Sequence, residues 1–210
     1  YAMLADPLRY MGHPSFSGLL LRHTTEELRE LIYKSKEIYP QIWKGIKWSE
    51  RKMQWEAPSG ARLWMSYLDR EDDVLRYQGL AFSWIGFDEL TQWATPYAWN
   101  YMRSRLRSVA SDLPVYMRAT TNPGGPGHQW VKKMFIDPAP YGRQFDATDI
   151  ESGNILSYPK GHTKSGQPLF KRRFIPARLS DNPYLAETGD YETMLLSLPE
   201  HQRKQLLEGD

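Results

Sequence analysis

The segment that most constrains the fold of this chain is residues 81–90, with the sequence AFSWIGFDEL. The run AFSWIGF is almost entirely apolar, and two carboxylates, Asp88 and Glu89, follow it directly. A short apolar run of this kind is typical of a strand that is buried on both faces of a parallel sheet. Parallel strands need long crossover connections, which are usually helices. The segment therefore predicts an α/β fold with a mostly parallel central sheet.

Strand and helix signals alternate along the rest of the chain, as this fold requires. Residues 17–22 (SGLLLR) predict a buried strand, and Thr24 with Glu27 forms a capping box for a helix that Pro40 is expected to end. We further expect a hairpin at 50–68, an exposed loop at 69–79, a helix starting at Thr95 and Pro96, a strand at 113–121, a short helix at 128–135, a strand at 174–179 and helices at 184–198 and 199–210.

The composition excludes several classes of site. The 210 residues contain no cysteine, so disulfides, zinc–thiolate centres and a cysteine nucleophile are excluded, and the five histidines are scattered without metal-ligand spacing. A net charge of +2 gives no global argument for nucleic-acid binding. The sequence has neither a membrane-length apolar run nor the layout of a signal peptide, so we expect an intracellular protein without membrane partners.

Asp88 and Glu89 are the first candidate site residues, because ligands of parallel α/β sheets bind at the carboxyl ends of the strands. Asp88 could hold Mg²⁺, usually through water, and Glu89 could accept a proton from an attacking water. The alternative is that the Asp-Glu pair simply begins the next loop and caps a helix.

Residues 119–125 (ATTNPGG) form the second motif, at the end of the next predicted strand. Thr120, Thr121 and Asn122 would place two hydroxyls and an amide where they could sense a γ-phosphate or the attacking water. The alternative is an ordinary strand followed by a Pro-Gly turn, for which Asn-Pro-Gly-Gly is natural chemistry.

Arg76 lies in the predicted loop, twelve residues before Asp88. An arginine on a loop near this edge could stabilise transition-state charge, in its own subunit or in a neighbouring one. The alternative is a surface arginine paired with one of the nearby acidic residues Glu71, Asp72 and Asp73.

Other basic residues suggest structural or nucleic-acid contacts. Arg22, at the end of the first strand, is expected to make a structural ion pair. Lys132 and Lys133, together with the run Lys171-Arg172-Arg173, could contact DNA phosphates, although short basic runs are more often solvated faces. A phosphate-binding loop ending in Gly-Lys-Ser/Thr does not occur anywhere in these 210 residues.

Several ordered blocks of the sequence together resemble the large terminase subunit of tailed bacteriophages, the ATP-driven motor that packages DNA into a procapsid. They are YAMLADPLRY, LLLRHTTEEL, EDDVLRYQG, FSWIGFDEL, SRLRS, TTNPGGPGHQWVKKMF, FIPARLSDNPYL and LPEHQRKQLLEGD, and they span essentially the whole chain. The resemblance implies that Asp88 is the Walker B aspartate and metal ligand and that Glu89 is the catalytic glutamate. It further implies that Thr120, Thr121 and Asn122 form the coupling motif, and that Arg76 is a candidate trans-acting arginine finger.

The same resemblance implies a P-loop NTPase-like (ASCE) three-layer fold, incomplete at its N-terminus, with ATP and Mg²⁺ as cofactors. Residues 1–175 would form the ATPase core and residues 176–210 a small helical lid or linker subdomain. Such proteins carry the phosphate-binding loop just before a segment like YAMLADPLRY and a nuclease domain after the ATPase. We therefore expect this chain to be a piece of a longer polypeptide that is inactive by itself.

The implied partners are double-stranded DNA, the portal protein, the terminase small subunit and further copies in a ring, within the host cytoplasm and not in the mature virion. Two alternatives stay open at this point. One is another nucleic-acid-dependent ATPase of helicase type, although no further helicase-type motif follows residue 150. The other is a non-enzymatic docking module, which would apply if the gene truly begins at Tyr1.

Overall fold

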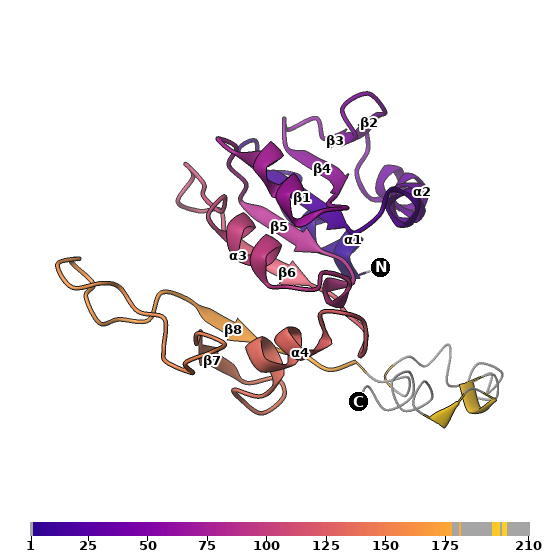
Figure 1. Ribbon diagram of the computed structural model, residues 1–210. Helices are drawn as coiled ribbons and strands as arrows, with labels where there is room; N and C mark the ends of the chain where they lie inside the picture. The colour runs from indigo at the N-terminus through magenta and orange to yellow at the C-terminus, as the bar shows by residue number, and fades with distance from the viewer. Residues whose placement is uncertain (1, 178–180, 182–194, 198, 201–210) are drawn as a thin grey trace. The chain divides into compact units, whose positions relative to one another are not determined.

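The structure is a computed structural model that describes residues 2–177, 181, 195–197, 199 and 200. The chain divides into two compact units, Tyr1–Thr121 and Asn122–Asp210 (Figure 1). Within the described residues, no helix combines the length and the apolar character needed to cross a membrane.

The first unit is built on a six-stranded sheet with the order β2-β3-β4-β1-β5-β6. Strands β4, β1, β5 and β6 run parallel, whereas β2 and β3 are antiparallel additions at one edge. The bounds are β1 Ser17–Arg22, β2 Lys47–Ser49, β3 Gln54–Glu56, β4 Arg62–Tyr67, β5 Trp84–Phe87 and β6 Tyr116–Ala119. The predicted mostly parallel sheet, the hairpin and the buried strand of the FDEL segment are therefore confirmed.

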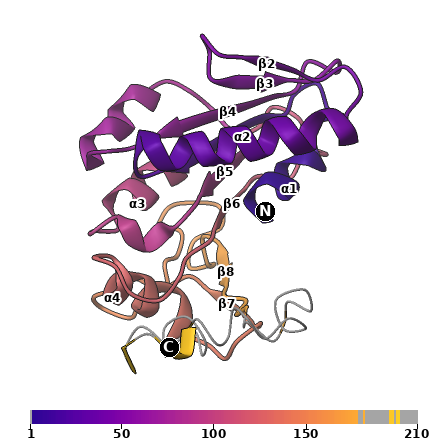
Figure 2. The same ribbon diagram turned by 90° about the vertical axis from the view of Figure 1, so that its right-hand side faces the viewer.

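Helices cover both faces of this sheet, which gives three layers (Figures 1 and 2). The helices are α1 Ala2–Leu8, α2 Thr25–Ile42 and α3 Tyr97–Arg103, with short 3₁₀ helices η1 Glu71–Tyr77 and η2 Leu90–Gln92. On β5, Trp84 donates its ring N–H to Asp6 of α1, whereas the ring of Phe87 lies 5.4 Å from that of Trp99 on α3. Alternate residues of β5 thus point toward opposite helical layers.

Helix α1 packs very closely on the sheet, and Gly86 of β5 makes this approach possible. A Cβ atom at Gly86 would lie 2.5 Å from the Met3 side chain and 2.3 Å from the Trp84 ring. The same face holds the buried carboxylate of Asp6, which lies 2.7 Å from Nη1 of Arg118 on β6. A glycine in the middle of a strand here serves close helix packing.

The expected end of the second helix was wrong in detail. The capping box of Thr24 and Glu27 starts α2 as predicted, but the helix continues through Pro40 to Ile42. Proline removes one backbone hydrogen bond, and the following turn is held because the N–H of Trp43 donates to the carbonyl of Tyr39 at 2.9 Å.

Residues 69–79 were expected to form an exposed loop, and this was only partly right. Most of the segment is the 3₁₀ helix η1, and its Val74 and Tyr77 are buried in the core. The many charges around these two residues hid the spacing i, i+3, which places both on one side of a 3₁₀ helix.

The second unit contains α4 His128–Val131, continued by a π-helical turn η3 Lys132–Ile136, and a two-stranded antiparallel sheet of β7 Gln144–Asp146 and β8 Lys171–Arg173. The expected short helix at 128–135 is confirmed. The strand expected at 174–179 is not: the strand is Lys171–Arg173, and residues 174–177 are irregular. The helices expected at 184–210 and the subdomain expected at 176–210 lie almost wholly outside the described residues, so the division at residue 175 stays a prediction.

Candidate active site at the carboxyl edge of the sheet

Three polar side chains form a row across the carboxyl edge of the parallel sheet. Arg22 ends β1, Asp88 directly follows β5 and Thr120 directly follows β6. In the sheet, Leu21 pairs with Phe87 and Phe87 with Ala119, so the row lies one residue beyond these pairs. Because side chains alternate along each strand, Arg22, Asp88 and Thr120 share one face, which is the face covered by α1.

The carboxylate of Asp88 is held from two sides by this row. Its Oδ2 lies 3.2 Å from Nε of Arg22, and its Oδ1 accepts a hydrogen bond of 2.5 Å from the Thr120 hydroxyl. The Arg22 and Asp88 side chains are only 17% and 14% exposed. The ion pair expected for Arg22 is therefore confirmed, and its partner is the predicted metal ligand.

Glu89 has a left-handed backbone conformation, with φ 60° and ψ 58°. Such a conformation costs a non-glycine residue about 1 kcal/mol or more. The surrounding hydrogen bonds hold it: the N–H of Glu89 donates to Thr120 Oγ1 at 3.4 Å and the N–H of Leu90 to the Thr120 carbonyl at 2.8 Å. Strain of this kind in a tightly held turn is typical of functional sites.

A second threonine pair ties the same two segments together. The Thr121 hydroxyl donates to Thr91 Oγ1 at 2.9 Å and accepts from the N–H of Thr91 at 3.2 Å. Thr91 is buried in η2 and was not among the residues predicted from the sequence. In the sequence, its position three residues after Asp88 is the one clue to a role at this site. Its contact with Thr121 could not be read from the spacing of the two threonines, because it depends on how the strands pair.

Arg76 lies at the same edge of the sheet, on the β4 side. Its Nη2 donates to the carbonyl of Tyr67 at 3.1 Å and lies 3.1 Å from Asp73 Oδ2. Tyr67 pairs in register with Arg22, so Arg76 and Asp88 are separated along the edge by strand β1. Arg76 is 47% exposed and paired with Asp73, which is the arrangement that the surface alternative describes.

The remaining predicted residues belong to the second unit. Asn122 is its first residue and is exposed. In the basic run of β8, Lys171 pairs with Asp146 at 2.7 Å, and Arg172 is buried, with its guanidinium 5.4 Å from the ring centre of Phe170. Arg172 is thus buried within this unit. It does not fit the DNA-phosphate contact that the sequence suggested for the run Lys171-Arg172-Arg173.

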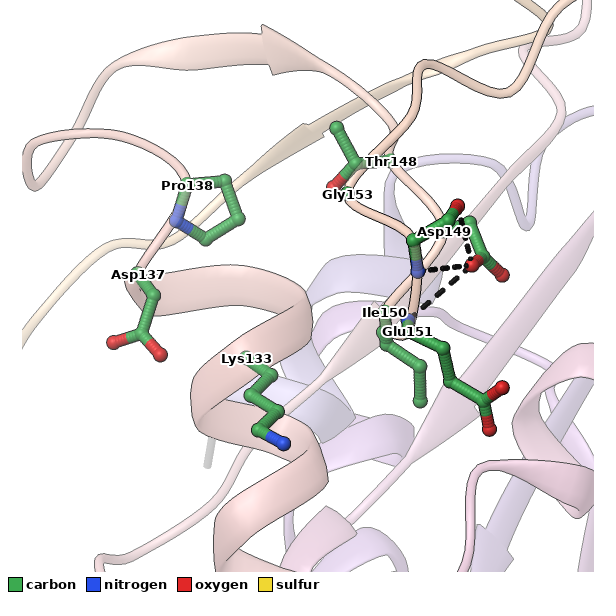
Figure 3. A pocket seen from close by; sticks show the side chains of 9 residues that line it. Lys133, Asp137, Pro138, Thr148, Asp149, Ile150, Glu151 and Gly153 are labelled. Atoms are coloured by element: carbon green, nitrogen blue, oxygen red, sulfur yellow. Dashed lines mark hydrogen bonds between the residues drawn. The ribbon is translucent and has the colours of Figure 1, made fainter.

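The second unit also has an open hollow of about 600 Å³ (Figure 3). Lys133, Asp137, Asp149 and Glu151 are among its lining residues. Hydrogen bonds from the backbone N–H and the hydroxyl of Ser152, each 2.8 Å long, hold the pKa of Asp149 below its usual value. The charges in the hollow are mixed, and the carboxylate of Asp149 is used by its own turn, so this hollow offers no chemistry comparable to the sheet edge.

The donors at the sheet edge suit Mg²⁺, which prefers oxygen ligands and is commonly held by one or two carboxylates plus substrate phosphates. Asp88 contributes a carboxylate that already attracts one cationic side chain, and Thr120 contributes a hydroxyl. Among the described residues, no group of three or more His, Cys, Asp or Glu side chains could hold a metal ion.

Comparisons with known proteins bear on the fold. No protein-family profile matches the sequence, and no curated protein matches it significantly. The solved large terminase of the thermophilic bacteriophage D6E, in complex with ADP, is similar in structure with a TM-score of 0.64 at 15% sequence identity, over 99% of this chain and 44% of that one. The chain therefore corresponds to less than half the length of the D6E protein.

The large terminase ATPase domain of Thermus phage P74-26 is also similar, with a TM-score of 0.52 at 12% identity, over 100% of this chain and 82% of that one. A variant of that domain gives 0.54 at 13% identity with the same coverage. The predicted P-loop NTPase-like fold is thereby confirmed. This chain has the fold of the ATPase domain of bacteriophage large terminases.

Proposed function

We propose that this chain is the ATPase motor domain of a phage large terminase, which couples ATP hydrolysis to movement of double-stranded DNA into a procapsid. The observation that carries the proposal is the position of Thr120, whose hydroxyl donates to the Asp88 carboxylate and accepts from the N–H of Glu89. One side chain of the predicted coupling motif thus touches both residues of the predicted hydrolytic pair. The terminase-like fold supports the same proposal.

In this proposal the two carboxylates have different roles because their backbones point them differently. Asp88 continues the direction of β5 and would hold Mg²⁺ through water, and the metal would neutralise charge on the phosphates. Glu89 leaves the strand in a left-handed turn and would accept the proton of the attacking water. Arg76 would stabilise transition-state charge on a neighbouring copy, after release from Asp73.

The coupling step would use the segment Thr120-Thr121-Asn122, which joins the two units in the chain. A change in the charges around Asp88 on hydrolysis would alter the hydrogen bond from Thr120, and the polypeptide would carry the displacement into the second unit. The portal protein, the small subunit and a ring of copies in the host cytoplasm are the partners and setting that this motor would require.

The test of the enzymatic proposal is Mg²⁺-dependent ATP hydrolysis. Residues 1–210 alone should hydrolyse ATP only at the background rate, because they contain no Gly-Lys-Ser/Thr loop. A chain extended upstream to include such a loop should be active, and Glu89→Gln should lower its turnover by roughly 10²-fold or more. Hydrolysis at an unchanged rate by the extended Glu89→Gln protein would show that Glu89 is not the catalytic base.

The motor proposal needs a separate measurement, because helicases share the hydrolytic pair. The extended protein should move along duplex DNA in an ATP-dependent way without separating the strands. Efficient strand separation in a fluorescence unwinding assay would instead favour the helicase-like alternative.

A further inference from the structure

Asp88, the proposed metal ligand, already has a cation beside it. Nε of Arg22 lies 3.2 Å from Oδ2 of Asp88, while Oδ1 accepts the Thr120 hydroxyl. Both carboxylate oxygens are thus engaged by the protein itself. A divalent ion at Asp88 would have to share the carboxylate with the guanidinium group or displace it.

The position of Arg22 makes this competition strong. The pair is largely withdrawn from water, with exposed fractions of 17% for Arg22 and 14% for Asp88, so solvent screens the guanidinium charge only weakly. Nε and Nη1 of Arg22 are both buried, and neither has a hydrogen-bond partner among the described residues, so the contact with Asp88 is a charge–charge contact within the protein. A cation arriving alone at Asp88 would therefore meet the like charge of the guanidinium group, which lies beside the same carboxylate.

We propose that Arg22 is a charge gate that keeps Mg²⁺ from binding at Asp88 unless nucleotide phosphates arrive with it. Arg22 lowers the negative potential of the carboxylate, so the free ion binds weakly. Triphosphate oxygens bring enough additional negative charge to hold both the metal and the guanidinium group. The metal site is then occupied only in the state that can hydrolyse ATP. This inference rests on the proposed function, because it assumes that Asp88 is the metal ligand.

The experiment measures metal binding without nucleotide, so that its readout is independent of hydrolysis. Mn²⁺ replaces Mg²⁺ as a paramagnetic probe, and free Mn²⁺ is followed by electron paramagnetic resonance in residues 1–210. Arg22→Gln removes the charge and leaves a shorter polar side chain, whereas Arg22→Lys keeps the charge. Far-UV circular dichroism and thermal unfolding show that each variant is folded.

Arg22→Gln should bind Mn²⁺ at least about 10-fold more tightly than the wild type, since removing one poorly screened unit charge is worth more than the energy of a tenfold change. Arg22→Lys should stay close to the wild type. The gain should vanish in the double variant Arg22→Gln/Asp88→Asn. Equal Mn²⁺ affinity of the wild type and Arg22→Gln would overturn the proposal. A gain in Mn²⁺ affinity that persists in Arg22→Gln/Asp88→Asn would overturn it as well.

If Arg22→Gln does not fold, the wild type supplies the test. The side-chain Nε–Hε resonance of Arg22 should stay unchanged when millimolar Mg²⁺ is added alone, because the ion pair persists. A saturable shift of this resonance, absent in Asp88→Asn, would overturn the proposal. If the metal titration contradicts the role of Arg22, the hydrolysis test with Glu89→Gln can still be interpreted. If the hydrolysis test fails, the metal titration can still be interpreted, so the two inferences are tested separately.

Discussion

The hydroxyl of Thr120 lies 2.5 Å from Oδ1 of Asp88, although the two residues are 32 positions apart in the sequence. They meet because β5 and β6 are adjacent parallel strands that end at the same level. A hydrogen bond to a carboxylate is stronger than one between neutral groups. The contact therefore links the predicted metal ligand to the predicted coupling motif directly, without an intervening residue.

Thr120→Val should destabilise the first unit, because it removes this hydroxyl while preserving the shape of the side chain. The free energy of unfolding should fall by about 1.5–3 kcal/mol, the usual contribution of a hydrogen bond to a charged group. Urea denaturation followed by tryptophan fluorescence measures the change. Thr120→Ser is the matched control, since it keeps the hydroxyl and should recover most of the loss; a valine variant as stable as the wild type would show that the bond contributes nothing.

Glu89→Gly should be more stable than Glu89→Ala by about 1 kcal/mol, the reverse of the usual order, because only glycine adopts φ 60° without strain. Both variants lack the carboxylate, so the comparison isolates the backbone. Urea midpoints of the two variants give the difference. Equal stability would mean that the turn relaxes when the glutamate side chain is removed, and that the strain is not stored in the backbone.

Stability should decrease at alkaline pH through the buried phenol of Tyr39. Burial raises the pKa of Tyr39 above its usual value, and its hydroxyl donates to the Leu4 carbonyl at 2.9 Å. The folded state keeps this proton at pH values at which the unfolded chain has lost it. The contribution of Tyr39 to the free energy of unfolding is therefore complete below about pH 10 and declines above that pH by about 1.4 kcal/mol per pH unit.

Urea unfolding at several pH values between neutral and strongly alkaline measures this decline. Tyr39→Phe should be somewhat less stable at neutral pH but should lose stability less steeply above pH 10, roughly the usual tyrosine pKa. Parallel pH profiles for the two proteins would contradict the assignment to Tyr39.

Arg76→Ala should separate stability from activity. The side chain is 47% exposed, so the loss of its pair with Asp73 should change the free energy of unfolding by at most about 1 kcal/mol. If Arg76 is the trans-acting finger, hydrolysis by the assembled, loop-containing protein should fall by roughly 10³-fold or more. Arg70→Ala, a neighbouring exposed arginine, is the control and should leave hydrolysis unchanged. If Arg76→Ala hydrolyses ATP at the wild-type rate, Arg76 is not the arginine finger and has only a structural role.

Much of the first unit could be predicted from local signals. The apolar run before Asp88 identifies β5, the capping box at Thr24 identifies the start of α2, and the apolar run at residues 17–22 identifies β1. These signals are local because burial and backbone capping act over a few neighbouring residues. The path of α2 through Pro40 was not predictable in this way, since it depends on how the last turn is held.

The amino-acid sequence alone was enough to place Asp88 and Glu89 after β5, and Thr120 and Thr121 after β6, and so to define the chemistry available at the ends of the buried strands. Which of these side chains touch depends on the three-dimensional fold. Strand register places Arg22 and Thr120 on either side of Asp88, and it places Thr91 against Thr121. The physical reason is that pairing between parallel strands is set by packing across the whole sheet, which no short stretch of sequence encodes.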